Sequence, residues 1–221
     1  MTKNRLNQPI LVYMYGMPGS GKTFLARQLS GLLGMAHVNS EQIRQSITAN
    51  PTYEREEQRI VRHLMNFMSE RFLDAGIGVI YDVSANRLGE RRALREMANR
   101  HDAKHLLIWM QIDIDSAWAR QEARDRRTFD DKYSEELDQK TFEQIVQIMQ
   151  NPQDEKPLVL SGKHLFNSQK NTIIRRLFEM GVLKEDAFEQ KIAKPELINL
   201  VPRTSSDPSR PEYTRRNVVI R

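Results

Sequence analysis

The chain has 221 residues, enough for one α/β domain with its own core, or for one domain and a small appendage. Hydrophobic residues make up 39% and charged residues 29%, which argues against disorder of the whole chain, and the absence of cysteine excludes disulfides and thiolate metal sites. Lys and Arg exceed Asp and Glu by 34 to 29, a mild positive balance that suits anionic ligands.

Short apolar runs alternate with longer amphipathic stretches in the first half of the chain, a pattern typical of βαβ units around a parallel sheet. Ile10–Tyr15 predicts a buried strand that leads directly into a glycine-rich turn. The next expected elements are a helix at 22–33, a strand at 35–38, a helix capped by Ser40 that reaches about 49, a helix at 54–75, a strand at 78–81 that ends on Asp82, a helix at 90–100 and a strand at 105–112.

The second half predicts more helix than strand. Its expected elements are a helix capped by Asp115 that enters the arginine-rich stretch 120–127, a helix at 135–149, a break at 151–157, helices at 167–180 and 184–193, and a Pro- and Ser-rich tail at 202–211. We therefore expect an α/β domain at 1–157 and a helical appendage with a basic tail at 158–221. No apolar run is long enough for a signal core or a membrane span, so we expect a cytoplasmic protein.

The turn after the first strand, Gly-Met-Pro-Gly-Ser-Gly-Lys-Thr at 16–23, matches G-x-x-x-x-G-K-T without a gap. Its glycines let successive backbone N–H groups face phosphates, and the following helix adds its positive dipole end. Lys22 would reach the β- and γ-phosphates, and the Thr23 hydroxyl would coordinate Mg²⁺. The motif predicts binding of ATP or GTP by Gly16, Pro18, Gly19, Ser20, Gly21, Lys22 and Thr23.

The segment 16–26, Gly-Met-Pro-Gly-Ser-Gly-Lys-Thr-Phe-Leu-Ala, resembles the opening of the polynucleotide-kinase and zeta-toxin-like P-loop kinases of the AAA_33 type. Three further segments continue the likeness: 39–47, then 79–92, then 120–127. The likeness implies a P-loop NTPase fold, in which a parallel β-sheet is flanked by helices on both faces. It also implies transfer of a γ-phosphoryl group from a nucleoside triphosphate to a hydroxyl, with Mg²⁺ as cofactor.

The segment 39–47 lies where this family holds an acid that activates the acceptor, usually Asp, and an arginine. Glu41 is therefore the candidate general base, and its alternative role is a first-turn acid that complements the helix dipole. Arg44 lies on the same helix face and would bind a phosphate of the acceptor, or pair with Glu41.

Asp82 ends an apolar strand, where residues that face ligands collect in open α/β sheets. It is a candidate catalytic and metal-binding residue, with a turn aspartate as the alternative. By resemblance, Asn86 would bind the acceptor. Arg87, Arg91 and Arg92 would line an acceptor groove or form a solvated helix start.

The arginine-rich stretch 120–127 corresponds to the family's lid. Arg124 and Arg127 are the candidates to neutralise charge on the transferred phosphoryl group. Interleaved acids leave a solvated, salt-bridged helix as the alternative.

The acceptor stays open between the 5′-hydroxyl of a nucleic acid and a small metabolite such as a nucleoside or a nucleotide sugar. The resemblance and the positive balance slightly favour the nucleic acid. A nucleotide-binding regulator without transferase activity and a toxin kinase are the further alternatives.

Overall fold

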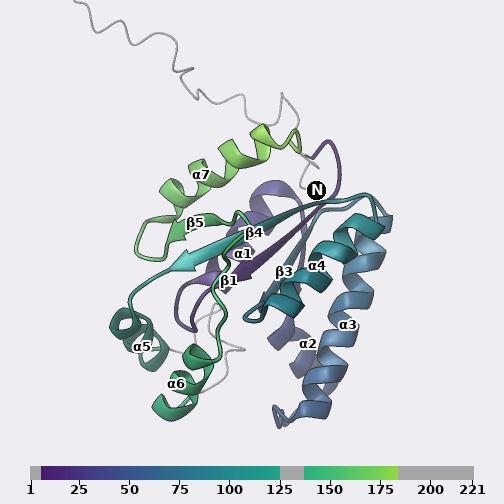
Figure 1. Cartoon of the computed structure of the whole chain (residues 1–221). Helices are drawn as coiled ribbons and strands as arrows, with labels where there is room; N and C mark the ends of the chain where they lie inside the picture. Colours follow the sequence, from purple (N-terminus) through teal and green to yellow (C-terminus); the bar gives the residue numbers. More distant parts are fainter. Residues whose placement is uncertain (1–5, 125–136, 184–221) are drawn as a thin grey trace, which may run out of the picture. The chain divides into compact units, whose positions relative to one another are not determined.

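The computed structural model describes residues 6–124 and 137–183. One sheet forms its centre, and its strands are β1 (Ile10–Tyr15), β2 (Ala36–Asn39), β3 (Val79–Ser84), β4 (Lys104–Gln111) and β5 (Leu158–Ser161). The strands lie in the order β2-β3-β1-β4-β5, and every neighbouring pair is parallel (Figure 1). Their carboxyl ends therefore meet at one edge, where α/β proteins bind ligands.

Seven helices accompany the sheet within the described residues: α1 (Lys22–Leu33), α2 (Ser40–Ile47), α3 (Arg55–Asp74), α4 (Leu88–Arg100), α5 (Ile114–Glu122), α6 (Gln139–Gln147) and α7 (Phe166–Glu179). Strand β1 is buried along its whole length, as its uninterrupted apolar run predicts. Alternate side chains of β1 face opposite sides of the sheet. Leu11, Tyr13 and Tyr15 pack in one cluster with residues of α3 and α4. Helix α1 contributes four buried residues of its own and touches α7 through an edge contact of Phe24 with Phe166. The expected fold class, a parallel sheet with helices on both faces, is confirmed.

The sheet extends beyond residue 157, where the sequence analysis placed the end of the α/β domain. Strand β5 pairs with β4 from Leu158 onward, and α7 buries Ile173, Ile174 and Leu177. Leu183 forms a bridge with Leu6 at the start of the chain. Residues 158–183 thus belong with the sheet. The expected helix at 184–193 and the tail at 202–211 lie outside the described residues.

Two helix caps differ from the expected ones by one or two positions. Asn39, not Ser40, caps α2, because its side chain accepts a hydrogen bond from the backbone of Gln42 at 2.8 Å. Asp113, not Asp115, caps α5 in the same way. The described helices include none that is both long and apolar enough to cross a membrane.

Candidate active site

The phosphate-binding motif forms a tight loop between β1 and α1. Gly19 and Gly21 have φ values of +79° and +93°, in the region where residues with a side chain are strained. A Cβ atom at Gly19 would also lie 2.2 Å from the backbone oxygen of Ala117 in α5. The loop therefore needs glycine at this position for its backbone conformation and for its close contact with α5.

Lys22 folds back over the loop that precedes it. Its Nζ donates hydrogen bonds to the backbone oxygens of Gly16 and Met17, both at 2.8 Å. The pKa of Lys22 is lowered to about 7, mainly by burial; the charge of Asp82 opposes this effect and that of Arg124 adds to it. The ammonium group is thus held where the sequence motif predicts a triphosphate. A bound anion would stabilise the charged form of Lys22, which burial disfavours.

A hollow of about 540 Å³ opens beside the loop and the first turn of α1. Its other walls come from the end of α5, with Arg120 and Arg124, and from the turn between β5 and α7. Arg120 Nη1 donates to the backbone oxygen of Gly162 at 2.9 Å and so connects these two walls. The hollow suits the parts of a nucleotide that extend beyond its phosphates.

The structure brings Thr23 and Asp82 together. Thr23 Oγ1 lies 3.3 Å from Asp82 Oδ1, although 59 positions separate them in the sequence. The other carboxylate oxygen, Oδ2, contacts Asn39 Nδ2 at 2.6 Å and His37 Nε2 at 2.8 Å. Asp82 is 4% exposed. A hydroxyl and a carboxylate at the foot of a phosphate loop are oxygen donors of the kind that Mg²⁺ prefers, so this pair fits the metal that the sequence implies.

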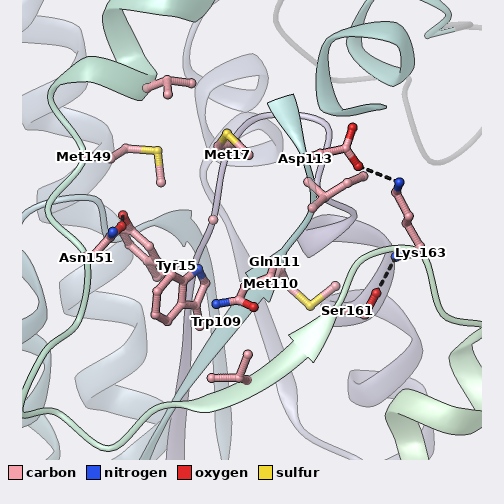
Figure 2. Close-up of a pocket in the computed structure, with 14 residues that line it drawn as sticks. Tyr15, Met17, Trp109, Met110, Gln111, Asp113, Met149, Asn151, Ser161 and Lys163 are labelled. Carbon is pink, nitrogen blue, oxygen red and sulfur yellow. Dashed lines mark hydrogen bonds and ion pairs between the residues drawn. The ribbon is translucent and has the colours of Figure 1, made fainter. Parts of the chain in front are cut away.

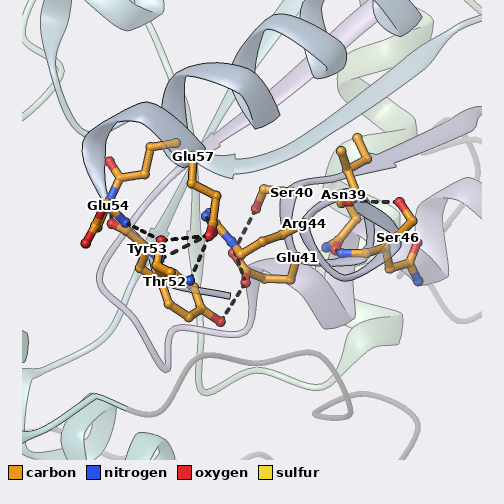
Figure 3. Close-up of polar contacts among 12 residues, drawn as sticks. Asn39, Ser40, Glu41, Arg44, Ser46, Thr52, Tyr53, Glu54 and Glu57 are labelled. Carbon is orange, nitrogen blue, oxygen red and sulfur yellow. Dashed lines mark hydrogen bonds and ion pairs between the residues drawn. The ribbon is translucent and has the colours of Figure 1, made fainter. Parts of the chain in front are cut away.

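Glu41 and Arg44 belong to a polar network that joins α2 to the start of α3 (Figure 3). Arg44 donates to Glu41 at 3.3 Å and to Glu57 at 2.6 Å, and its guanidinium lies 4.4 Å from the ring centre of Tyr53. Arg44 is only 6% exposed. The i,i+3 ion pair that the sequence analysis left as an alternative is therefore present, and Arg44 is already neutralised by two carboxylates.

The same network fixes the turn that leads into α3. Glu57 accepts hydrogen bonds from the backbone N–H groups of Thr52 and Tyr53, at 2.7 and 3.3 Å. These bonds and Arg44 lower the pKa of Glu57 to about 2. Tyr53 has a positive φ of 57°, and its hydroxyl donates to Glu41 at 3.2 Å. Among the described residues, Glu41 accepts hydrogen bonds from Tyr53 at 3.2 Å and from Arg44 and Ser40 at 3.3 Å, all of them long.

The residues that follow β3 divide into buried and exposed positions. Arg87 is exposed at the start of α4, and the Asn86 side-chain oxygen is buried and has no hydrogen-bond partner among residues 6–124 and 137–183. Arg91 does not line a groove. It is 1% exposed, pairs with Glu155 at 2.7 Å and donates to the backbone oxygen of Ala85 at 3.0 Å. Its role is to fasten the segment before β5 onto α4.

Only one of the two candidate lid arginines can be placed. Arg124 borders the hollow beside Lys22 and is close enough to influence its pKa. Arg127 lies outside the described residues.

A second, larger hollow borders the start of the loop (Figure 2). It measures about 870 Å³ and is bordered by Met17 of the loop, by Trp109 of β4 and by Met149 and Asn151, which follow α6. Tyr15, which packs edge-on against Trp109 at 5.5 Å, donates its hydroxyl hydrogen to Asn151 at 2.6 Å. Among the described candidate site residues, Gly16 of the loop is the one that borders this hollow.

Four residues around the site were not predicted from the sequence: His37, Asn39, Tyr53 and Glu57. Asn39 carried a usable signal, because it is a polar residue at the end of a strand next to the strand of Asp82. The other three act through contacts between separate elements, which a single sequence does not reveal.

The chain matches the family of AAA domains designated AAA_33 over residues 11–152. Among curated protein sequences, none matches it. The fold is similar to that of Kti12 from Chaetomium thermophilum, solved in complex with ADP-AlF3, at 17% identity and a TM-score of 0.59 over 76% of this chain and 97% of that chain.

Two kinases show the same likeness of fold. A gluconokinase from Sinorhizobium meliloti 1021 is 15% identical, with a TM-score of 0.54 over 80% of this chain and 95% of that chain. The Mycobacterium tuberculosis APS kinase CysC, solved with AMPPNP and APS, is 14% identical, with a TM-score of 0.55 over 77% and 98%. The family match covers more than half of the sequence, and the sheet order and the phosphate loop agree with it. The chain therefore belongs to the AAA_33 family of AAA domains and has the fold of the P-loop kinases.

Proposed function

We propose that this chain is a P-loop phosphotransferase that moves the γ-phosphoryl group of ATP or GTP onto a hydroxyl group of a small metabolite. One observation carries the proposal: the Thr23 hydroxyl faces the Asp82 carboxylate at 3.3 Å, beside a partly buried Lys22, at the foot of a complete phosphate loop. These are the parts that P-loop enzymes use to hold a triphosphate and its metal ion.

Each group has a distinct role in the proposed reaction. The loop amides and Lys22 bind the phosphates, and Thr23 and Asp82 would hold Mg²⁺, which would neutralise charge on the β- and γ-phosphates. Glu41 orients the acceptor hydroxyl and accepts its proton. Arg124, which follows α5 and borders the hollow beside Lys22, would neutralise charge on the transferred group. The rate enhancement then comes mainly from positioning and electrostatics.

The charges around the candidate base favour an uncharged acceptor. Arg44, the residue expected to bind a phosphate of the acceptor, is held by Glu41 and Glu57, and this trio carries a net charge of about −1 when all three are ionised. A 5′-terminal nucleotide brings its own phosphates, which this trio repels. The fold likeness to a gluconokinase agrees with a small acceptor. The positive charge of the whole chain supports the nucleic acid as the competing candidate.

The test is transfer of labelled γ-phosphate, with wild type compared with Lys22→Ala and Glu41→Gln. Both variants lose transfer; Glu41→Gln keeps nucleotide affinity, because Glu41 lies outside the phosphate loop. The two acceptor pools are sugars and nucleosides on one side and 5′-hydroxyl oligonucleotides on the other. Labelling of oligonucleotides alone would contradict the small-metabolite proposal.

A regulator and a toxin predict other results. A regulator binds nucleotide tightly and labels no acceptor in either pool. A toxin arrests growth when it is expressed, and Lys22→Ala relieves the arrest.

A further inference from the structure

Two side chains of β2 hold the carboxylate of Asp82. Asn39 Nδ2 donates to Oδ2 at 2.6 Å, and His37 Nε2 lies 2.8 Å from the same oxygen. An ionised carboxylate only accepts hydrogen bonds, so Nε2 of His37 carries the hydrogen. Asp82 is 4% and Asn39 6% exposed, so little water competes for these bonds. The carboxylate is therefore fixed by two donors from one neighbouring strand.

The register of the sheet explains how these residues meet. Asn39 lies opposite Asp82 in the parallel pair of β2 and β3, and His37 precedes Asn39 by two positions, on the same face of β2. The alternate residues Val38 and Tyr81 belong to the cluster packed against α3 and α4. His37, Asn39 and Asp82 thus project from the opposite face, on which α1 begins with Lys22 and Thr23.

His37 and Asn39 both contact Oδ2 of Asp82 and leave Oδ1 to other partners. With Oδ2 occupied, Oδ1 is the oxygen that faces the Thr23 hydroxyl. If Thr23 were its single contact, the Asp82 carboxylate could rotate about its Cβ–Cγ bond. The three contacts together define the plane of the carboxylate. This arrangement directs a single carboxylate oxygen to the foot of the phosphate loop.

We propose that His37, with Asn39, is a positioning residue for a hydrated Mg²⁺ ion at Thr23 and Asp82. The inference rests on the proposed function, because the ion would arrive with the nucleotide. It also separates the two candidate acids. Asp82, held from β2 and turned to Thr23, serves the metal, and Glu41 is left as the base. Groups that orient metal ligands in this way change metal affinity by about 10- to 100-fold when they are removed.

The test compares ADP affinity with Mg²⁺ and with a chelator, measured by calorimetry, so that it does not depend on turnover. In His37→Ala the strengthening of ADP binding by Mg²⁺ falls about tenfold, while the affinity without metal stays that of wild type. His37→Gln, which keeps an N–H donor, recovers most of the loss. His63→Ala, an exposed histidine on α3, is the matched control and behaves as wild type.

Different failures have different meanings. If His37→Ala keeps the full effect of Mg²⁺, or weakens ADP binding equally with and without metal, the positioning role is refuted and the proposed function is untouched. If wild type binds no nucleotide, both are refuted. Asn39→Ser removes the amide N–H donor to Asp82 but keeps a side chain that can cap α2, so it repeats the test should His37→Ala not fold. An unchanged Mg²⁺ effect in that variant would refute the role as well.

Discussion

Nucleotide binding should take up a proton at Lys22. Because the pKa of this lysine is about 7 in the free protein, about nine-tenths of the Lys22 amines are neutral at pH 8. A bound triphosphate favours the charged form and restores the proton. We therefore expect uptake of about 0.9 proton per nucleotide at pH 8 and about 0.1 at pH 6.

The sign of the pH dependence follows from the same linkage. Below pH 7 the lysine is already charged, and the full affinity is available. Above pH 7 each further unit costs up to about tenfold in affinity, because a proton must first be bound. At pH 8 the phosphates of the nucleotide are themselves ionised, so they contribute little to the uptake.

Calorimetry in buffers of different ionisation enthalpy measures this uptake directly. The slope of the observed enthalpy against the buffer enthalpy gives the number of protons taken up. Lys22→Arg is the matched variant, because a guanidinium stays charged and should give a slope near zero. Tight binding by wild type at pH 8 without proton uptake would refute the argument that burial lowers the pKa of Lys22.

Two further predictions concern the fold around the site. Gly19→Ala should abolish nucleotide binding and lower the melting temperature, because its Cβ would lie 2.2 Å from a backbone oxygen of α5. Gly31→Ala is the matched control: a Cβ there would meet nothing within 4 Å, so it should stabilise α1 by about 0.5–1 kcal/mol. Equal melting temperatures for both variants would contradict this. Arg91→Ala leaves Glu155 buried without one partner and should cost about 3–5 kcal/mol in urea unfolding, against less than about 1 kcal/mol for exposed Arg59→Ala. A loss at Arg91 no larger than that at Arg59 would show that the buried pair contributes little.

The sequence was most informative where a local pattern determines the structure. The apolar run before the loop predicted β1, and the spacing of glycine, lysine and threonine predicted a loop that the structure forms. The apolar run before Asp82 indicated a position that faces a ligand, and in the structure the Asp82 carboxylate lies 3.3 Å from Thr23 Oγ1. These inferences need only a few adjacent residues and the geometry of parallel strands.

The sequence was least informative where partners lie far apart in the chain. Arg91 occupies a helix start rich in charge, which suggested an exposed groove, but Glu155, 64 positions later, pairs with it in the interior. Strand β5 directly follows the predicted break at 151–157, and Val159 is 47% exposed, so its short apolar run does not stand out as a strand. In both cases the deciding interaction forms only when the sheet assembles.

The close approach of Gly19 to Ala117 has a mechanical consequence. Because Gly19 has no side chain, the backbone of the phosphate loop packs directly against the backbone of α5. Any displacement of the loop that accompanies phosphate entry would push directly on α5, which ends two residues before Arg124. A ligand that moves the loop would then also move the end of α5 that leads to Arg124.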